Sequence, residues 1–73
     1  MHFIGIDIGS TSSKVAVMDE HGKFYELFLL PSGFSAVRVA RQIKQNLEQK
    51  GYGEGFVTAT GYGRVSVEYA QLS

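Results

Sequence analysis

Residues 2–18 read HFIGIDIGSTSSKVAVM and hold two β-prone runs on either side of a small polar loop. In the first run isoleucine recurs at every second position and Phe3 makes the other face partly apolar, which predicts a strand covered on both faces. Residues 9–13, GSTSS, interrupt the apolar pattern, and a second β-prone run follows at 15–18. We therefore expect the chain to begin with a β-hairpin.

A third strand and an amphipathic helix are predicted after the hairpin. Turn-forming residues at 19–23 precede an apolar run over 24–30, which is typical of a strand. Either Ser32 or Ser35 can then cap a helix whose apolar residues recur at spacings of four, three and four. Gly51 stands where a helix commonly ends.

The last part of the chain predicts a fourth strand over 56–60, a glycine-rich turn at 61–64, and the opening of a second helix over 65–72. The order is β-β-β-α-β-(α). A right-handed crossover through the helix places the fourth strand parallel to the first, on its free edge. We expect an α/β fold with a mixed sheet of strand order 3-2-1-4.

Length, charge and cysteine content exclude several classes of protein. The chain has 73 residues, enough for one small domain. Seven Lys and Arg balance seven Asp and Glu, so no net charge draws the chain to nucleic acid or to anionic lipid. It contains no cysteine and no apolar run of the roughly 18 residues that a membrane span needs. We expect a cytoplasmic protein without nucleic acid or membrane partners.

One helix can cover only one face of the predicted sheet, although the third strand offers apolar side chains to both faces. Alternation places Tyr25, Leu27 and Leu29 on one face and Phe24, Glu26, Phe28 and Leu30 on the other. We therefore expect that residues 1–73 are the N-terminal piece of a larger protein, or that the chain forms a homodimer through its uncovered face or sheet edges.

Residues 7–14, DIGSTSSK, form the first candidate site. Gly9 lets the backbone approach a phosphate, consecutive N–H groups can bind an anion, and Asp7 at the end of the strand can hold Mg²⁺ through water. Lys14 adds a cation. The simpler alternative is a hairpin loop that only turns the chain. A P-loop is excluded because no Gly-Lys-Ser/Thr follows at the required spacing.

Residues 60–64, TGYGR, form the second candidate, where exposed N–H groups and Arg64 can meet an anion. The alternative is a tight turn without a ligand. A dinucleotide fingerprint is excluded because its third glycine is missing. If the first and fourth strands are parallel neighbours, Asp7 and Gly61 emerge at the same carboxyl edge, where open α/β sheets bind ligands. The sequence thus predicts one cleft from two loops.

Residues 5–14 and 59–64 together resemble the beginning of the CoA-substrate-specific enzyme activases. These are the ATP-dependent activators of 2-hydroxyacyl-CoA dehydratases and the related ATPase subunits of benzoyl-CoA reductase. The resemblance runs from about residue 3 to 68. The family belongs to the acetate and sugar kinase, heat-shock chaperone and actin superfamily. The resemblance therefore implies that residues 1–73 are the first part of an actin-like ATPase lobe, with a ribonuclease H-like half-lobe fold.

The resemblance also implies an activity, in which ATP hydrolysis drives the passage of one electron from an iron–sulfur cluster to a dehydratase or reductase partner. Asp7 would be the catalytic residue that positions Mg²⁺. The residues assigned to binding ATP or ADP are Gly9, Ser10, Thr11, Ser12, Ser13, Lys14, Gly61, Gly63 and Arg64. Family members hold their cluster with cysteines outside the region of resemblance and bind ATP between two lobes, so we expect this chain alone to be inactive.

Two other functions are compatible with the residues. The first is a ribonuclease H-like module that acts only in folding or interaction, with a loop that binds nothing. The second is a lobe of a sugar or acetate kinase, which the turn at 60–64 fits less well than it fits the activators.

Overall fold

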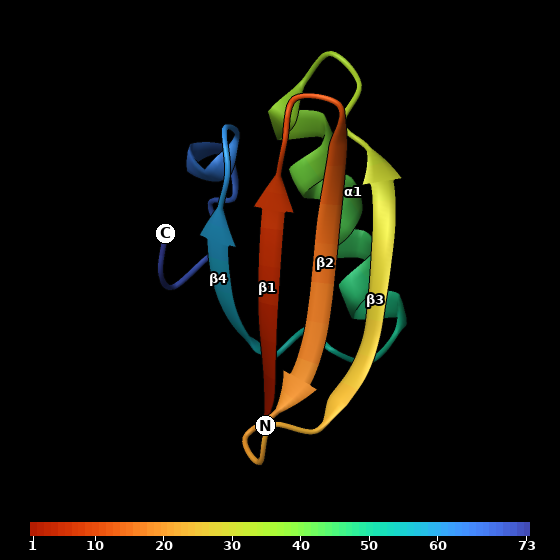
Figure 1. The fold of residues 1–73 in the computed structure, drawn as a ribbon, viewed down its shortest axis with the longest axis vertical. Helices are drawn as coiled ribbons and strands as arrows, with labels where there is room; N and C mark the ends of the chain where they lie inside the picture. Colours follow the sequence, from red (N-terminus) through yellow and green to blue (C-terminus); the bar gives the residue numbers. More distant parts are fainter.

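Four strands and one α-helix make up the computed structural model, which describes all 73 residues (Figure 1). The elements are β1 (His2–Ile8), β2 (Ser12–Asp19), β3 (Phe24–Pro31), α1 (Ala36–Gln49), β4 (Phe56–Thr60) and the short 3₁₀ helix η1 (Arg64–Ser66). Helix α1 has 14 residues, and no helix combines the length and apolarity that a bilayer crossing requires.

The strands form one mixed sheet of order β3-β2-β1-β4. Strand β2 pairs antiparallel with both β1 and β3, whereas β4 pairs parallel with β1. Helix α1 connects β3 to β4 across one face of this sheet (Figure 1). The predicted α/β class and the strand order 3-2-1-4 are confirmed.

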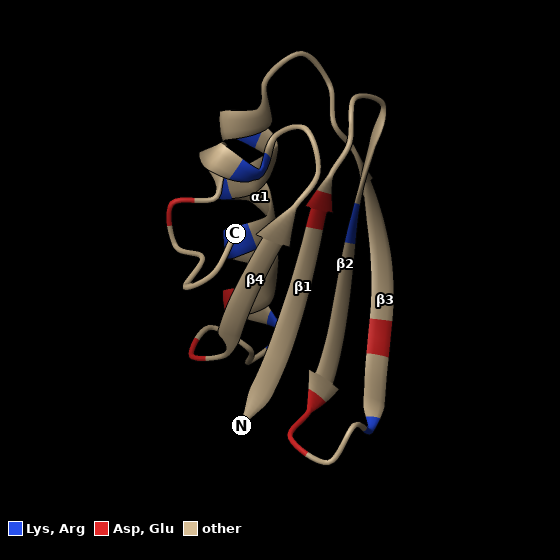
Figure 2. Ribbon diagram, turned by 60° about the vertical axis from the view of Figure 1, so that its left-hand side comes forward, with Lys and Arg blue, Asp and Glu red and all other residues tan.

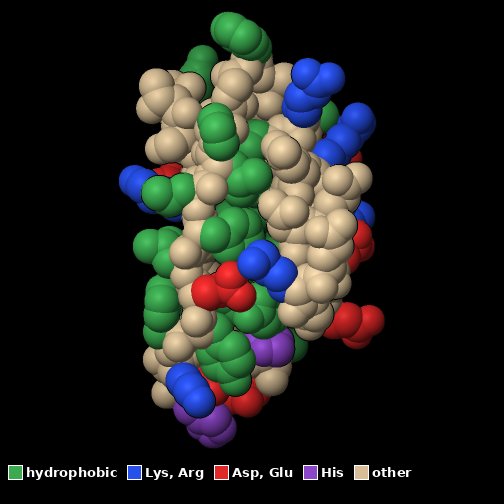
Figure 3. Space-filling model, turned by 90° about the vertical axis from the view of Figure 1, so that its right-hand side faces the viewer, with side chains coloured by type: hydrophobic (Ala, Val, Ile, Leu, Met, Phe, Trp, Pro, Cys, Tyr) green, Lys and Arg blue, Asp and Glu red, His purple; other side chains and the backbone are tan.

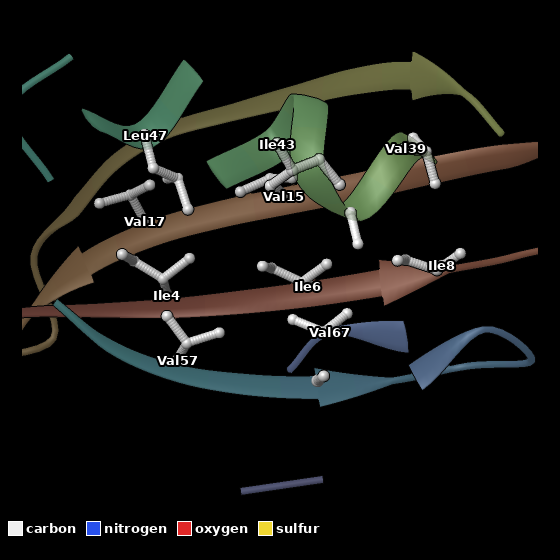
Figure 4. Close-up of a cluster of buried hydrophobic side chains, with 12 residues drawn as sticks. Ile4, Ile6, Ile8, Val15, Val17, Val39, Ile43, Leu47, Val57 and Val67 are labelled. Atoms are coloured by element: carbon white, nitrogen blue, oxygen red, sulfur yellow. The ribbon is translucent and has the colours of Figure 1, made fainter. Parts of the chain in front are cut away.

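The core lies between the sheet and α1. Twelve buried apolar side chains form it, with Ile4, Ile6 and Ile8 of β1 in the middle row (Figure 4). Ile43 and Leu47 of α1 cover that row from above and are 0% and 3% exposed. Burying an aliphatic side chain of this size stabilises the fold by about 1.5–3 kcal/mol. The period-two isoleucines of β1 are thus the floor of the core.

Two residues define the ends of α1. Ser35 is the N-cap, because its side chain accepts a hydrogen bond from the Arg38 N–H at 3.2 Å. At the other end Lys50 is the C-cap, and Gly51 follows with φ +86°. Ser32, the other candidate for the N-cap, is buried and bonded elsewhere.

The edge strand β3 carries an irregularity that changes which way Tyr25 faces. Val17 pairs with Glu26 and Met18 pairs with Phe24, so Tyr25 has no partner of its own. The Tyr25 ring instead meets the edge of the His2 ring at a centroid distance of 5.1 Å, on the α1 side of the sheet. The expectation that Tyr25 shares a face with Leu27 and Leu29 is therefore wrong. The expectation that Phe24 shares a face with Glu26 is also wrong. Both fail because the bulge shifts the alternation at the start of β3.

The helix expected over 65–72 is absent. The segment begins with the three-residue η1, and the chain then returns along the outer edge of β4. There the Gln71 N–H donates to Val57 O at 2.9 Å, and the Ala59 N–H donates to Leu72 O at 2.8 Å. Two turns of isolated helix are marginal in water, so pairing with a free strand edge competes successfully. The second helix of the predicted order is therefore wrong.

The face of the sheet opposite α1 has no covering element (Figure 2). Phe3, Met18, Leu27 and Leu29 alternate with the inward-facing residues of their strands and are 38%, 38%, 57% and 61% exposed. Figure 3 shows hydrophobic side chains running along the β3 side of the molecule. The prediction that the helix covers only one face of the sheet is confirmed.

Candidate functional site at the carboxyl edge of the sheet

The two predicted loops lie side by side where β1 and β4 end. Asp7 and Thr60 are partners in the parallel pair, so the chain leaves both strands at the same edge. The Gly63 N–H donates to Ile8 O at 3.0 Å, which fastens the turn after β4 to the end of β1. The two loops come from the beginning and the end of the sequence and form one rim.

The loop at 9–13 turns its carbonyl groups inward. Gly9 O accepts from Ser32 Oγ at 2.6 Å, and Thr11 O accepts from the Ser32 N–H at 3.0 Å. Ser12 O accepts from the Gly9 N–H at 3.1 Å. The N–H groups of Ser10 and Thr11, by contrast, have no hydrogen-bond partner within the protein. A loop with bonded carbonyls and free amides is suited to bind an anion.

Glycine is required at three positions of the rim by close contacts. A Cβ on Gly9 would lie 2.8 Å from Ser12 O, and one on Gly63 would lie 2.8 Å from Ala36 Cβ. Gly61 has φ +90°, and a Cβ there would collide with Asp7 Oδ1 and lie 2.7 Å from Ile8 O. The turn at 61–64 is therefore packed directly against the ends of β1 and α1.

Asp7 and Lys14 face the open side of the sheet. They are cross-strand partners in the β1–β2 pair, and Thr60 flanks Asp7 on its other side. Asp7 is half-buried, and its carboxylate forms no hydrogen bond or ion pair within the protein. No three acidic or histidine side chains gather to hold a metal ion. Asp7 is thus a single unpaired carboxylate at the end of β1, next to the turn that begins at Gly61.

Two of the predicted binding residues point away from solvent or fold back on the turn. Ser13 is fully buried, and its Oγ lies 2.8 Å from Ser32 Oγ. Arg64 is exposed, and its Nη1 donates to Gly61 O at 3.2 Å. The side chain of Ser13 thus bonds to Ser32 and that of Arg64 to its own turn, whereas Ser10, Thr11 and Ser12 are exposed.

A cavity of about 320 Å³ opens beside the rim on its α1 side. Its lining includes Gly9, Ser10, Gly63 and the segment at 32–36 that leads into α1. The exposed rings of Phe34 and Tyr62 also line it. Asp7, Lys14, Gly61 and Arg64 do not line it. The predicted residues therefore share one edge of the sheet but divide between its two sides.

Sequence reasoning missed the segment at 32–36, which was considered only as a helix start. The available signal was the strand register, because β2 pairs with β3 beside the loop and Ser12 lies opposite Pro31. A hydroxyl at position 32 then falls next to the loop at 9–13. Ser32 is 7% exposed and donates the hydrogen bonds that Gly9 O and Thr11 O accept.

The side chains with shifted pKa values lie away from the rim. Hydrogen bonds from Lys50 and Tyr52 lower the pKa of Glu26, and the same bond to Glu26 raises the pKa of Tyr52. Burial raises the pKa of Tyr69 to about 12, and its hydroxyl donates to Ala40 O at 2.6 Å. These groups tie β3 and the C-terminal segment to α1.

Comparison with known proteins identifies the family of the chain. Residues 4–72 match the sequence profile of the BadF/BadG/BcrA/BcrD ATPase family. The chain belongs to this family. One curated relative in the BadF/BadG/BcrA/BcrD ATPase family is the (R)-2-hydroxyglutaryl-CoA dehydratase activating ATPase of Acidaminococcus fermentans. It is 35% identical to this chain over 93% of the chain and 27% of the relative.

Solved structures of dehydratase activators share the fold. Component A of the Acidaminococcus fermentans (R)-2-hydroxyglutaryl-CoA dehydratase is 32% identical, with a TM-score of 0.67 over 93% of this chain and 27% of that one. The activator of the 2-hydroxyisocaproyl-CoA dehydratase from Clostridium difficile, solved with bound ADPNP, is 27% identical, with a TM-score of 0.74 over 97% of this chain and 28% of that one. The chain thus spans little more than a quarter of the length of these relatives.

Proposed function

We propose that this chain supplies the first phosphate-binding wall of an ATP site, in an ATPase that activates a 2-hydroxyacyl-CoA dehydratase or a related reductase. The observation that carries the proposal is the loop at 9–13, where the carbonyls are bonded inward and the amides of Ser10 and Thr11 are free. The named activity of the Acidaminococcus relative and the ADPNP bound to the Clostridium activator support it.

Each rim residue has a role in this proposal. The amides of Ser10 and Thr11 donate to phosphate oxygens, and the exposed hydroxyls of the loop add further donors. Lys14, the cross-strand partner of Asp7, and Arg64, in the turn after β4, neutralise phosphate charge. Such a site works by positioning and charge neutralisation, and it needs no covalent step from the protein.

Asp7 fits magnesium that arrives with the nucleotide. Mg²⁺ commonly keeps several waters and is held by one or two carboxylates together with phosphate oxygens, not by a protein cage. A single unpaired carboxylate at the end of β1 matches that donor set. When bound, the ion would neutralise charge on the phosphates.

An iron–sulfur cluster does not fit these residues. The 73 residues contain no cysteine and therefore supply no thiolate ligand. Electron transfer accordingly has no step within this chain. We also propose that the chain by itself does not turn over ATP, since it provides one wall of the site. The cytoplasmic location stays a prediction of the sequence.

The open face of the sheet leads to a proposal about assembly. We propose that two copies associate through this face or through the free edge of β3, where Leu27 and Leu29 are exposed. Contiguous exposed apolar side chains and an unpaired strand edge both favour association. The alternative proposal is that residues 1–73 form one part of a larger actin-like lobe.

Nucleotide binding can be tested on the 73-residue chain by NMR. Titrating ¹⁵N-labelled protein with Mg-ADPNP should shift the amide signals of Ser10, Thr11 and the turn at 61–64, with a dissociation constant on the order of 1 mM, near −4 kcal/mol. Asp7→Asn should weaken this binding about tenfold in the presence of Mg²⁺ and much less with ADPNP alone.

Glu54→Gln is the matched control, because it also removes one acidic charge from an exposed position, outside the rim. It should leave the titration unchanged. The proposal fails if the strongest shifts fall outside the rim, or if Asp7→Asn and Glu54→Gln bind alike. Micromolar affinity, or ATP turnover by the isolated chain, would overturn the part of the proposal that makes it one wall of a larger site.

A further inference from the structure

Ser32 touches the candidate phosphate loop at three points. Its Oγ donates to Gly9 O at 2.6 Å, its backbone N–H donates to Thr11 O at 3.0 Å, and its Oγ lies 2.8 Å from Ser13 Oγ. Ser32 and Ser13 are 7% and 0% exposed. Ser32 thus bonds to the loop twice through its hydroxyl and once through its backbone, although it lies about 20 positions away in the chain.

The direction of these hydrogen bonds follows from the number of protons. A serine hydroxyl has one proton, and Gly9 O can only accept, so the Ser32 proton goes to Gly9. Ser13 must then be the donor in the Ser13–Ser32 pair. The chain of bonds runs from Ser13 Oγ to Ser32 Oγ to Gly9 O, so that each of the three oxygens has a hydrogen bond.

This chain of bonds controls which way the Gly9 peptide faces. With its carbonyl held inward by Ser32, the same peptide unit directs the Ser10 N–H outward, because C=O and N–H point in opposite directions across a trans peptide. Ser32 lines the cavity beside the rim and contacts no phosphate donor directly. It acts through the loop.

We propose that Ser32 is a positioning residue, whose hydroxyl fixes the Gly9 peptide so that the Ser10 amide faces a bound phosphate. The ligand named here rests on the function proposed above, whereas the effect on the loop does not. Ser32→Ala removes the hydroxyl and keeps the backbone bond to Thr11. Ser13→Ala removes only the first donor and leaves the Ser32 bond to Gly9 intact.

The test compares four variants of the 73-residue chain by amide hydrogen exchange and by Mg-ADPNP titration. Ser32→Ala removes the bond to Gly9 O and should loosen the loop, which the Gly9 N–H reports because it closes the loop by donating to Ser12 O. Exchange at this N–H should speed up about tenfold or more, and nucleotide binding should weaken by a similar factor. Ser13→Ala should have a clearly smaller effect on both. Ser32→Thr, which keeps the hydroxyl, should restore the wild-type values.

Tyr69→Phe is the control for a merely structural effect, because it removes another partly buried hydroxyl, bonded to Ala40 O, far from the loop in sequence. It should lower stability without a specific change at Gly9. The positioning role is overturned if Ser32→Ala changes Gly9 exchange no more than Tyr69→Phe does, or if Ser32→Thr fails to restore it while remaining folded. If the wild type binds no nucleotide but the exchange pattern holds, the proposed function fails and the role of Ser32 in the loop stands.

Discussion

Gly61 adopts φ +90° at the point where β4 leaves the sheet, against the carboxylate of Asp7. The glycine-rich turn was predicted from the sequence, but its reason was not, since the contact with Asp7 depends on the parallel pairing of β1 and β4. The burial of Ser13, in contrast, depends only on the local hairpin. Its burial follows from its pairing with Ile8 in the hairpin register, because cross-strand partners face the same side of a sheet.

Replacing Gly61 with alanine should therefore be costly. We expect Gly61→Ala to lower the free energy of unfolding by at least about 2 kcal/mol, from left-handed backbone strain and from the collision with Asp7 Oδ1 and Ile8 O. Gly22→Ala is the control, because Gly22 has φ +79° with no atom within 4 Å of the added Cβ. It should cost about 1 kcal/mol. If urea denaturation shows that both variants lose the same free energy of unfolding, the contact with Asp7 does not contribute to the cost of Gly61→Ala.

At the scale of the elements, those with a long and regular pattern were predictable. Helix α1 and the four strands follow from periodicity and turn residues, and the crossover rule gives their order. The segment at 65–72 was not predictable, because a helical pattern of two turns does not decide between a short helix and pairing with the edge of β4. The bulge at Tyr25 was not predicted either. The sequence of β3 alone does not mark the extra residue, because the shift of side chains between faces appears only in its pairing with β2.

The edge strand β3 is tied to the end of α1 by a pH-sensitive contact. Glu26 Oε1 accepts from Lys50 Nζ at 3.1 Å and its Oε2 accepts from the Tyr52 hydroxyl at 2.9 Å, which holds the pKa of Glu26 below its ordinary value of 4.5. A carboxylate with a lowered pKa stabilises the fold above its unfolded pKa, and that contribution is lost as the pH falls through the folded value. Wild type should therefore be more stable than Glu26→Gln at neutral pH.

The measurement is thermal unfolding as a function of pH. The difference in melting temperature between wild type and Glu26→Gln should shrink as the pH falls below 4.5. Glu54→Gln, which removes an exposed carboxylate, should show no such convergence. A difference for Glu26→Gln that stays constant from neutral to acidic pH would mean that charge on Glu26 does not hold β3 to α1.

At the scale of the whole molecule, the proposed dimer depends on the open sheet face. Leu27→Lys and Leu29→Lys place charge on this face and should shift the protein from dimer to monomer in sedimentation at matched concentrations. Val37→Lys is the control, because Val37 is a 46% exposed apolar residue of α1, on the covered side of the sheet. It should leave the dimer intact. A wild-type chain that sediments as a monomer at every concentration would contradict the proposed assembly.

The parallel pairing of β1 with β4 has one more consequence, which concerns folding. The rim is built from residues about 50 positions apart in the sequence, so it exists only after the chain has closed its longest loop. Any phosphate compound that binds there selects molecules in which this closure is complete. By mass action, such a compound would raise the melting temperature in proportion to the logarithm of its concentration. A nucleotide that binds at the rim would then also stabilise the folded chain against unfolding.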